Sequence, residues 1–400
     1  MIGVIADDLT GAAEIGAIGL RHGLRAEIVR SGRPGNGAQL VCVDTDSRSC
    51  QASEAARRAA AAAQLLRAAG AEWIYKKVDS VLRGHVTAEV EAVMSQLQLN
   101  RAILLPANPS LGRIIRDGRY FVRGKPLHKT EFARDPEYPR RVAEVTRLLK
   151  LPEKFSLRLS NGDFAASDGA ITIAAAATAE DVRAWATCCQ ANVLAAGGAE
   201  FFDALLAAGA GAAPVNHPPP VMEMPAEANR AEGAVSGRRE LFVCGTSTEA
   251  ARRFAAAARR RKTPVFSLPR ELMWGAAFSV PAQETLARRI IAALVDHPRV
   301  LLNVGLPAVR EAGVARQLSD YVVQLAERVL RQTPVGRVFA EGGATAAALV
   351  RRMGWARLMV LQEHAPGVAT LAVDGAEAVW LTIKPGSYAW PAQWTDRCVI

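Results

Sequence analysis

Charged and hydroxyl side chains follow three short apolar segments near the start of the chain. The segments are Ile2–Ala6, Leu40–Val43 and Trp73–Tyr75, and each reads as a buried strand. The candidate side chains that come after them are Asp7, Asp8, Arg48, Lys76, Lys77, Asp79, Ser80 and Arg83. Aspartate accepts hydrogen bonds from hydroxyl groups, and arginine and lysine bind carboxylates, arginine through a two-pronged contact. This mixture suits a small molecule that carries several hydroxyl groups and a carboxylate.

Each of these residues also has a purely structural interpretation. Asp, Ser and Thr are favoured at helix N-caps and in turns, whether or not a ligand binds there. Capping alone, however, does not account for charges of both signs at three strand ends. We therefore expect a binding site, whose residues must be brought together by the elements that precede them.

The segments around these residues alternate between strand and helix. Further strands are predicted at Ala26–Val29 and Ala102–Leu105, and helices at Ala12–His22, Ser53–Ala69, Thr87–Leu97 and around Ala179–Ala191. This order predicts a parallel sheet covered by helices, and ligands bind at the carboxyl ends of such strands. Residues 106–140 are rich in Pro, Gly and Arg, and we expect them to form a long functional loop region.

A second α/β region is predicted after residues 210–238. That stretch has three consecutive prolines and several glycines without periodicity, which indicates a linker. The strands predicted beyond it are Leu241–Cys244, Val265–Ser267, Val300–Val304, Arg337–Ala340, Leu358–Leu361 and Ala378–Ile383. The predicted fold class is α/β, with two parallel-sheet domains at residues 1–209 and 239–400 and the active site in the cleft between them.

A pair of glycines joins a strand to a helix in the second region. Phe339–Thr345 leads directly into a predicted helix at Ala346–Met353. Glycines let the backbone approach a ligand, and the helix start offers free N–H groups to an anion. The turns at Cys244–Ser247 and Lys384–Ser387 are also small or contain glycine, so the three turns together predict a nucleotide cradle. Tight packing is the alternative explanation for the glycine pair.

Composition narrows the class of protein. The chain has 400 residues, of which 50% are hydrophobic and 22% charged, as is typical of globular proteins. Its formal net charge is +10, but aromatic and basic residues do not interleave as a nucleic-acid groove requires, so we expect no nucleic-acid partner. Without a long apolar run or a secretory signal, we expect a cytoplasmic protein that does not bind membranes. Six scattered cysteines predict neither a disulfide framework nor a zinc site.

Several well-known motifs are missing from the sequence. It has no G-x-x-x-x-G-K-[ST], no G-x-G-x-x-G after the first strand and no G-x-S-x-G. These absences disfavour a P-loop enzyme, a dinucleotide-dependent dehydrogenase and an α/β-hydrolase. A doubly wound dehydrogenase is kept as the lesser alternative, and a non-catalytic sensor of sugar acids is the other one.

The motifs of the chain resemble those of the four-carbon acid sugar kinases. IADDLTGA is similar to the opening motif of this family, and KKVDSVLRGH is similar to its second motif. PANPSLGRIIRDGRYFV and TEFARDPEYP resemble its loop signatures. FAEGGATAAALV resembles its nucleotide-domain glycine motif, and KPGSYAW resembles its terminal motif. The matches follow the order of the family over almost the whole chain.

The resemblance implies an N-terminal domain for a sugar acid and a C-terminal domain for ATP. It implies transfer of the γ-phosphate to the terminal (C4) hydroxyl of a four-carbon acid such as threonate, erythronate or 3-oxo-tetronate. The implied substrate contacts are Asp8, Arg48, Lys77, Asp79 and Ser80, to which Asp7, Lys76 and Arg83 are added by position. The implied ATP contacts are Ser247, Gly342, Gly343, Ala344, Thr345 and Gly386. A homodimeric assembly is compatible with this reading.

Phosphoryl transfer to an alcohol needs a group that accepts the hydroxyl proton. Asp8 and Asp79 are the candidate catalytic bases, and we favour Asp8 because Asp79 stands next to cations. Asp8 could instead cap a helix that begins near Gly11. Arg48 and Lys77 are the candidates for a clamp on the substrate carboxylate. Mg²⁺ is expected with ATP, because the phosphates need neutralising, but no motif identifies its ligands.

Overall fold

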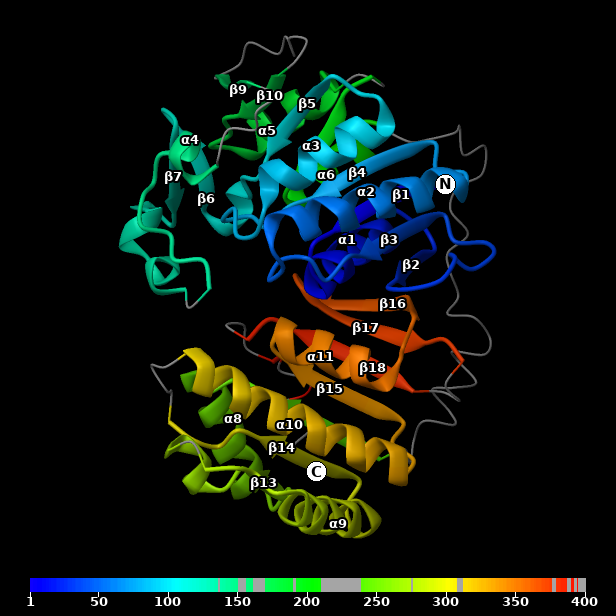
Figure 1. Ribbon diagram of the computed structural model, residues 1–400, viewed down its shortest axis with the longest axis vertical. Coiled ribbons are helices and arrows are strands. Elements are labelled where there is room, and N and C mark those ends of the chain that lie inside the picture. The colour runs from blue at the N-terminus through cyan, green and yellow to red at the C-terminus, as the bar shows by residue number, and fades with distance from the viewer. Residues whose placement is uncertain are drawn as a thin grey trace. The chain divides into compact units, whose positions relative to one another are not determined.

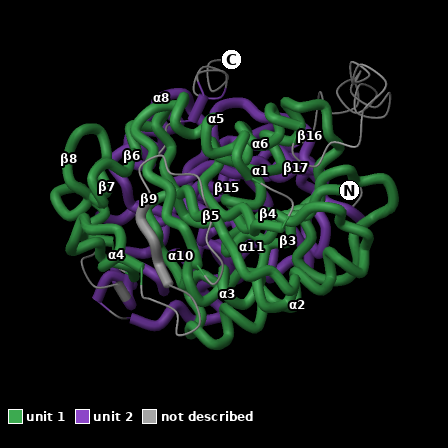
Figure 2. The backbone as a smooth tube through the Cα atoms, turned by 90° about the horizontal axis from the view of Figure 1, so that it is seen from above, with its two compact units in different colours: residues 1–219 green, residues 220–400 purple. Residues whose placement is uncertain are grey.

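The computed structural model divides into two compact units. Figure 1 shows its helices and strands, and Figure 2 colours unit 1 (residues 1–219) and unit 2 (residues 220–400). The structure describes residues 1–135, 137–149, 156–160, 170–189, 192–209, 239–274, 276–307, 312–375, 379–386, 390, 391 and 394. The predicted linker at 210–238 lies outside the described residues, so it stays a prediction.

Unit 1 contains a parallel sheet with the strand order β2-β3-β1-β4-β11-β5-β10-β9. The strands are β1 (Ile2–Ala6), β2 (Ala26–Val29), β3 (Leu40–Asp44), β4 (Trp73–Lys77), β5 (Arg101–Leu105), β9 (Ser156–Ser160), β10 (Ala170–Ala174) and β11 (Leu194–Gly197). β1 lies between β3 and β4, and Ile2 is paired with both Leu40 and Trp73. Both faces of β1 and β3 are buried, which is why these strands read as continuous apolar runs.

Helices of unit 1 cover both faces of its sheet. They are α1 (Leu9–Arg21), α2 (Ala52–Ala68), α3 (Val86–Leu97), α5 (Ala179–Thr187) and α6 (Ala199–Ala207). The crossover from β1 to β2 runs toward one edge of the sheet, whereas those from β3 to β4 and from β4 to β5 run toward the other. Right-handed crossovers in opposite directions place their helices on opposite faces, and α1 indeed packs against α6 while α2 packs against α3. The carboxyl end of β1 is therefore a topological switch point, where open α/β sheets bind ligands.

A small antiparallel sheet occupies much of the region that the sequence predicted as a loop. Its strands are β6 (Arg113–Arg116), β7 (Arg119–Val122) and β8 (Lys125–Pro126), paired in that order. Asp117-Gly118 and Arg123-Gly124 connect them, and all four residues have positive φ, as two-residue hairpin turns require. The loop prediction was wrong here because these strands are very short and rich in arginine, so they lack an apolar pattern.

Unit 2 contains a mixed sheet with the order β13-β14-β12-β15-β18-β17-β16. Its strands are β12 (Glu240–Cys244), β13 (Val265–Ser267), β14 (Arg299–Asn303), β15 (Arg337–Glu341), β16 (Arg357–Ala365), β17 (Val368–Val373) and β18 (Trp380–Lys384). β12, β13, β14, β15 and β18 pair in parallel, as predicted. β17 is antiparallel to both β16 and β18, so the prediction of an all-parallel sheet is corrected for this edge.

The second sheet also has a switch point. Its main helices are α8 (Glu249–Arg260), α9 (Val280–Asp296), α10 (Ala312–Gln332) and α11 (Gly343–Met353). The crossover from β12 runs to β13 on one side, whereas those from β14 and β15 run to the other side. α9 and α11 both pack against α10, so these three helices form one layer. The carboxyl end of β12, between β14 and β15, is the second expected ligand edge.

An aromatic cluster anchors the core of unit 2. Phe242 on β12 stacks on Phe339 of β15 with 4.2 Å between ring centroids, and Trp390 and Trp394 meet these rings edge-on. These rings bury apolar area directly beneath the switch point, which gives the turns above them a rigid support.

Most predicted elements are confirmed, with shifts of a few residues at their ends. The prediction missed β9, β10, β11 and β17, and α5 ends at Thr187 rather than at Ala191. Ala-rich strands such as Leu194–Gly197 (LAAG) carry no β-branched residue, so they read equally well as helix. Within the described residues, no helix is both long and apolar enough to cross a membrane.

Candidate active site

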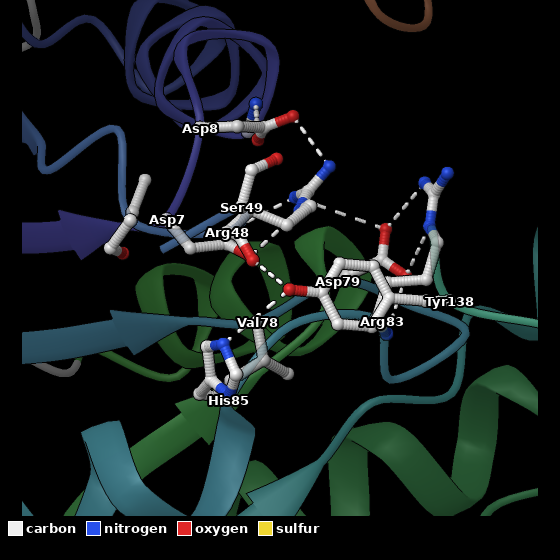
Figure 3. A network of polar contacts seen from close by, with 12 residues as sticks. Asp7, Asp8, Arg48, Ser49, Val78, Asp79, Arg83, His85 and Tyr138 are labelled. Atoms are coloured by element: carbon white, nitrogen blue, oxygen red, sulfur yellow. Dashed lines mark hydrogen bonds and ion pairs between the residues drawn. The ribbon is translucent and has the colours of Figure 1, made fainter. Parts of the chain in front are cut away.

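Three carboxylates surround the guanidinium group of Arg48 at the switch point of unit 1 (Figure 3). Arg48 Nε and Nη2 each donate to one oxygen of Asp7 over 2.8 Å, and Nη1 donates to Asp8 Oδ2 over 2.7 Å. Asp79 Oδ1 lies 3.9 Å from Nη2. The ends of β1, β3 and β4 thus meet as the parallel sheet predicts. Arg48 already has carboxylate partners on two sides, which a free clamp for a substrate carboxylate would lack.

Asp8 caps a helix and also faces the charge cluster, while its role as a base stays a prediction. Its Oδ1 accepts a 2.8 Å hydrogen bond from the backbone N–H of Gly11, so it caps helix α1. Its Oδ2 faces Arg48. Its side chain is 23% exposed, against 5% for Asp7 and 8% for Asp79. Of the three carboxylates, Asp8 is therefore the most accessible to a ligand.

The three carboxyl groups differ in their pKa because burial and charge act on them unequally. For Asp8, burial outweighs the attraction of Arg48 and holds the pKa above the ordinary aspartate value. For Asp7, burial is overcome by the charge and hydrogen bonds of Arg48, so the pKa lies below that value. For Asp79, burial is overcome by Arg83 and Arg48, and the pKa falls well below it. Asp8 is thus the carboxylate best suited to accept a proton.

The two lysines of β4 lie on different sides of the strand. Lys76 is fully buried and pairs with Glu89 over 2.7 Å, while Glu89 accepts a second bond from Ser47. Lys77 lies 3.2 Å from Glu14. Burial lowers the pKa of this lysine, but the charges of Glu14 and of the nearby aspartates together overcome burial and raise it. The structure therefore gives Lys76 an internal partner away from solvent, and this geometry favours a positioning role over direct contact with substrate.

Arg83 and the small sheet hold the turn after β4. Arg83 makes a two-pronged contact with Asp79, at 2.8 and 3.0 Å, and a third contact of 3.3 Å with Asp135. Tyr120 Oη donates to the carbonyl of Ser80. Tyr138 Oη donates in the same way to the carbonyl of Arg48, beside His85 in Figure 3. Side chains from the region predicted as a loop thus pin both charged turns.

Three turns come together at the switch point of unit 2. The N–H of Gly342 donates to the carbonyl of Lys384 over 2.8 Å. Gly342 has a φ of +100°, and a Cβ there would lie 2.9 Å from a methyl carbon of Thr246. A Cβ at Gly386 would meet the same methyl carbon at 2.9 Å, and one at Gly245 would lie 2.1 Å from Thr345 Oγ1. Glycine is required at these close approaches, which leaves a backbone surface without side chains.

The predicted ATP contacts surround this surface. Ala344 is exposed, Ser247, Gly343 and Gly386 are half-buried, and Gly342 and Thr345 are buried. Thr345 Oγ1 lies 3.3 Å from Ser319 Oγ, so the buried side chain of Thr345 packs between α10 and the turn at Gly245.

A buried carboxylate ties the three turns of unit 2 to one another. Glu341 accepts from Thr246 Oγ1 over 2.7 Å and from Trp390 Nε1 over 3.1 Å. Its Oε2 lies 3.4 Å from Nζ of Lys384, and both side chains are 1% exposed. The ends of β15 and β18 and the turn after β12 therefore each contribute one side chain to the same buried cluster.

The structure brings together all eight predicted residues of unit 1 and the six of unit 2, each set at its own sheet edge. Sequence reasoning missed the supporting residues Glu89, Arg113, Tyr120, Tyr138, Glu341 and Lys384 as site residues. Arg113, Tyr120 and Tyr138 stand inside the two loop signatures, so a signal for them existed. Glu341 and Lys384 also stand inside quoted motifs, FAEGGATAAALV and KPGSYAW, whereas Glu89 gave no signal, because a glutamate within a helix has no pattern that predicts burial. Among the described residues, no group of three or more His, Cys, Asp or Glu is placed to hold a metal ion.

Comparison with known proteins agrees with this division into two units. Residues 2–205 match a family described as a sugar-binding N-terminal domain, and residues 241–388 match one described as a nucleotide-binding C-terminal domain. A D-threonate kinase of Cupriavidus necator is 30% identical over 98% of both chains. A D-threonate kinase of Salmonella typhimurium is 38% identical over 151 residues, which are 36% of this chain and 36% of that protein.

A solved structure from Salmonella typhimurium has the same fold. Its TM-score is 0.79 at 19% identity, and the match covers 97% of this chain and 96% of the other. The names of the relatives support a kinase role. The chain belongs to the four-carbon acid sugar kinase family, in which a sugar-binding N-terminal domain is joined to a nucleotide-binding C-terminal domain.

Proposed function

We propose that this protein is an ATP-dependent kinase that phosphorylates the terminal C4 hydroxyl of a four-carbon sugar acid. The observation that carries the proposal is Asp8: of the three carboxylates around Arg48 it is the most exposed, and its pKa is raised above the ordinary aspartate value. Relatives named D-threonate kinase make threonate the first acid to test, followed by erythronate and 3-oxo-tetronate.

The acid binds at the charged edge of unit 1. Asp8 accepts the proton of the C4 hydroxyl as the bond to phosphorus forms. General-base catalysis of this kind typically raises the rate by a factor of about 10²–10⁴. Arg48 keeps Asp7 and Asp8 in place and limits the rise in the pKa of Asp8. Asp79 stays ionised at neutral pH and orders Arg83, so we assign it a positioning role rather than the alternative role of base. Lys77, at the end of β4, and Ser80, in the turn after it, remain proposed substrate contacts.

ATP binds at the glycine edge of unit 2. The close approach of Gly342 and Gly386 leaves a surface without side chains beside the start of α11, whose first N–H groups and positive dipole end can bind phosphate. Ser247, Gly343, Ala344 and Thr345 complete the proposed contacts. Transfer requires the two ligands to meet, so the cleft between the two domains stays a prediction of this function. The homodimer and the cytoplasmic location stay predictions as well.

Mg²⁺ is proposed to enter together with ATP. A magnesium ion on nucleotide phosphates needs only one or two carboxylates from the protein. Asp7, Asp8 and Asp79 are all paired with arginines, so the nucleotide phosphates and water are proposed to supply most of the ligands of the ion. The ion would neutralise charge on the β- and γ-phosphates.

An ADP-release assay tests this function. The panel contains D- and L-threonate, D- and L-erythronate, 3-oxo-tetronates and the uncharged tetritols, each with Mg-ATP. We expect ADP release with at least one acid and none above background with the tetritols, and phosphorus NMR of the product should place the phosphate on C4. Acid binding without ADP release would favour the sensor, and turnover of the acid with a nicotinamide nucleotide would favour the dehydrogenase. Either result would refute the proposal.

A further inference from the structure

Arg113, on the small sheet of unit 1, differs from the cations of the charged edge in its partners. Each of Arg48, Lys76, Lys77 and Arg83 lies within 3.3 Å of at least one carboxylate oxygen. In the described part of the chain, Arg113 has no carboxylate within salt-bridge distance. It is nevertheless half-buried, and a desolvated cation without a counter-charge is unfavourable.

Neutral groups hold the Arg113 guanidinium in one orientation. Its Nη1 donates to Ser80 Oγ, and its Cζ lies 5.7 Å from the ring centroid of Phe132. Arg83 lies 6.0 Å from the same ring, but Asp79 and Asp135 neutralise it. An arginine has five N–H donors, and the described structure uses one of them on Arg113. The group is therefore oriented but largely unused.

Arg140 is a second arginine of this region for which no carboxylate lies within salt-bridge distance among the described residues. It is buried, however, and donates to the backbone carbonyls of Tyr138 and Leu82. These bonds attach the segment around Tyr138 to the turn after β4, which gives Arg140 a structural task. Among the described residues, Arg113 donates only to the hydroxyl of Ser80, which stands next to Asp79 at the ligand edge.

We propose that Arg113 binds the carboxylate of the sugar acid and so selects acids over neutral sugars. This inference rests on the proposed function, and it moves the clamp from Arg48 and Lys77 to a residue of the small sheet. A guanidinium group binds a carboxylate through two parallel hydrogen bonds. The contact with Phe132 holds the guanidinium plane of Arg113 in one orientation, so its donors are already positioned for such a contact. Ser80 serves as the tether for Arg113 at the far end of the substrate from Asp8.

Paired arginine variants on strand β6 test the proposal. Arg113→Gln should raise the KM for threonate, or for the best acid of the panel, by roughly 10- to 100-fold and leave the KM for ATP within about twofold. Arg113→Lys should give a smaller loss, because lysine keeps the charge without the fork. Arg116→Gln is the matched control: it removes the same charge from the same strand at an exposed site beside Phe121, and it should leave both KM values unchanged.

Calorimetry with the acid alone separates this inference from the proposed function. If the wild-type protein binds threonate but never releases ADP, the kinase proposal fails, and Arg113→Gln is judged by its loss of binding relative to Arg116→Gln. If the wild type turns over the acid and Arg113→Gln keeps its acid KM, Arg113 is not the clamp although the kinase stands. A wild type that neither binds nor converts any acid of the panel overturns both. Thermal melting of each variant shows that it is folded, and a fall in Tm without a change in acid KM would mean that Arg113 is only an anchor.

Discussion

The two units share one topological feature, the switch point of an α/β sheet, but carry different kinds of residues at it. The strand at the switch point is β1 in unit 1 and β12 in unit 2. Its crossover connection runs toward one edge of the sheet, whereas those of its two neighbouring strands run toward the opposite edge. At the end of β1 the chain places three carboxylates around one arginine. At the end of β12 and its neighbours it places glycines whose backbones nearly touch other turns. We infer that the topology sets the position of each ligand site and that the residues after the strands set which ligand it takes.

A second likeness between the two units is a buried ion pair below each ligand edge. Each unit buries a lysine from a strand end against a glutamate: Lys76 with Glu89 at 2.7 Å in unit 1, and Lys384 with Glu341 at 3.4 Å in unit 2. Each glutamate also accepts a hydroxyl hydrogen bond from a neighbouring turn, from Ser47 or from Thr246. A charged group at the base of each edge thus ties separate strand ends together, whatever ligand binds above it.

Removing one partner of these buried pairs should have the largest effect on stability. Glu89→Gln and Glu341→Gln each remove the carboxylate that is paired with a buried lysine, which typically costs about 3–5 kcal/mol. Urea unfolding followed by tryptophan fluorescence measures the loss in each variant. Glu249→Gln, which removes an exposed pair with Arg253, is the control and should cost about 0–1 kcal/mol. Losses below about 1 kcal/mol for the buried pairs would show that the likeness is only geometric.

Asp8→Asn tests the chemical difference between the edges. Asparagine caps α1 about as well as aspartate, so Tm should be retained, but it cannot accept a proton. We expect kcat to fall by at least about 10²-fold with the KM for ATP nearly unchanged. The matched control is Thr178→Asn at the N-cap of α5 in the same unit, which should leave kcat as it is. Near-normal kcat in a stable Asp8→Asn protein would turn attention to Asp79.

The pH dependence of the reaction should report the charge cluster of unit 1. Asp8 must be ionised to act. Because its pKa is raised, kcat should begin to fall on acidification at a higher pH than it would with an ordinary aspartate, whose pKa is about 3.9. Arg48 lowers the pKa of Asp8, so Arg48→Ala should move this acidic limb further up in pH. A pH–rate profile of both proteins gives the answer. A limb that stays in place or moves down would mean that Asp8 is not the titrating group.

The sequence predicted the strand ends, and with them most of the site, because parallel strands bring their carboxyl ends to one edge. Asp7, Arg48 and Asp79 were found without any structure for that reason. It did not predict that Arg48 would be neutralised by these carboxylates, since pairing among neighbouring charges depends on side-chain geometry. It also missed Arg113, because the small sheet that carries it has strands too short to show a pattern. Glu89 and Glu341 were missed because burial of a glutamate follows from its tertiary partner and not from local sequence.

The division of labour between the two edges is tested most directly by binding each ligand alone. Calorimetric titrations of threonate and of ADP are made on the wild type, on Arg48→Ala in unit 1 and on Gly342→Val in unit 2. Gly342→Val forces a side chain against Thr246 at the glycine turn, so it should weaken ADP binding by at least about tenfold and leave threonate binding within about twofold. Arg48→Ala should do the reverse, because it releases Asp7 and Asp8 from their shared partner. If either variant weakened both ligands equally while remaining folded, or if Gly342→Val weakened only threonate, the assignment of the acid to unit 1 and the nucleotide to unit 2 would be wrong.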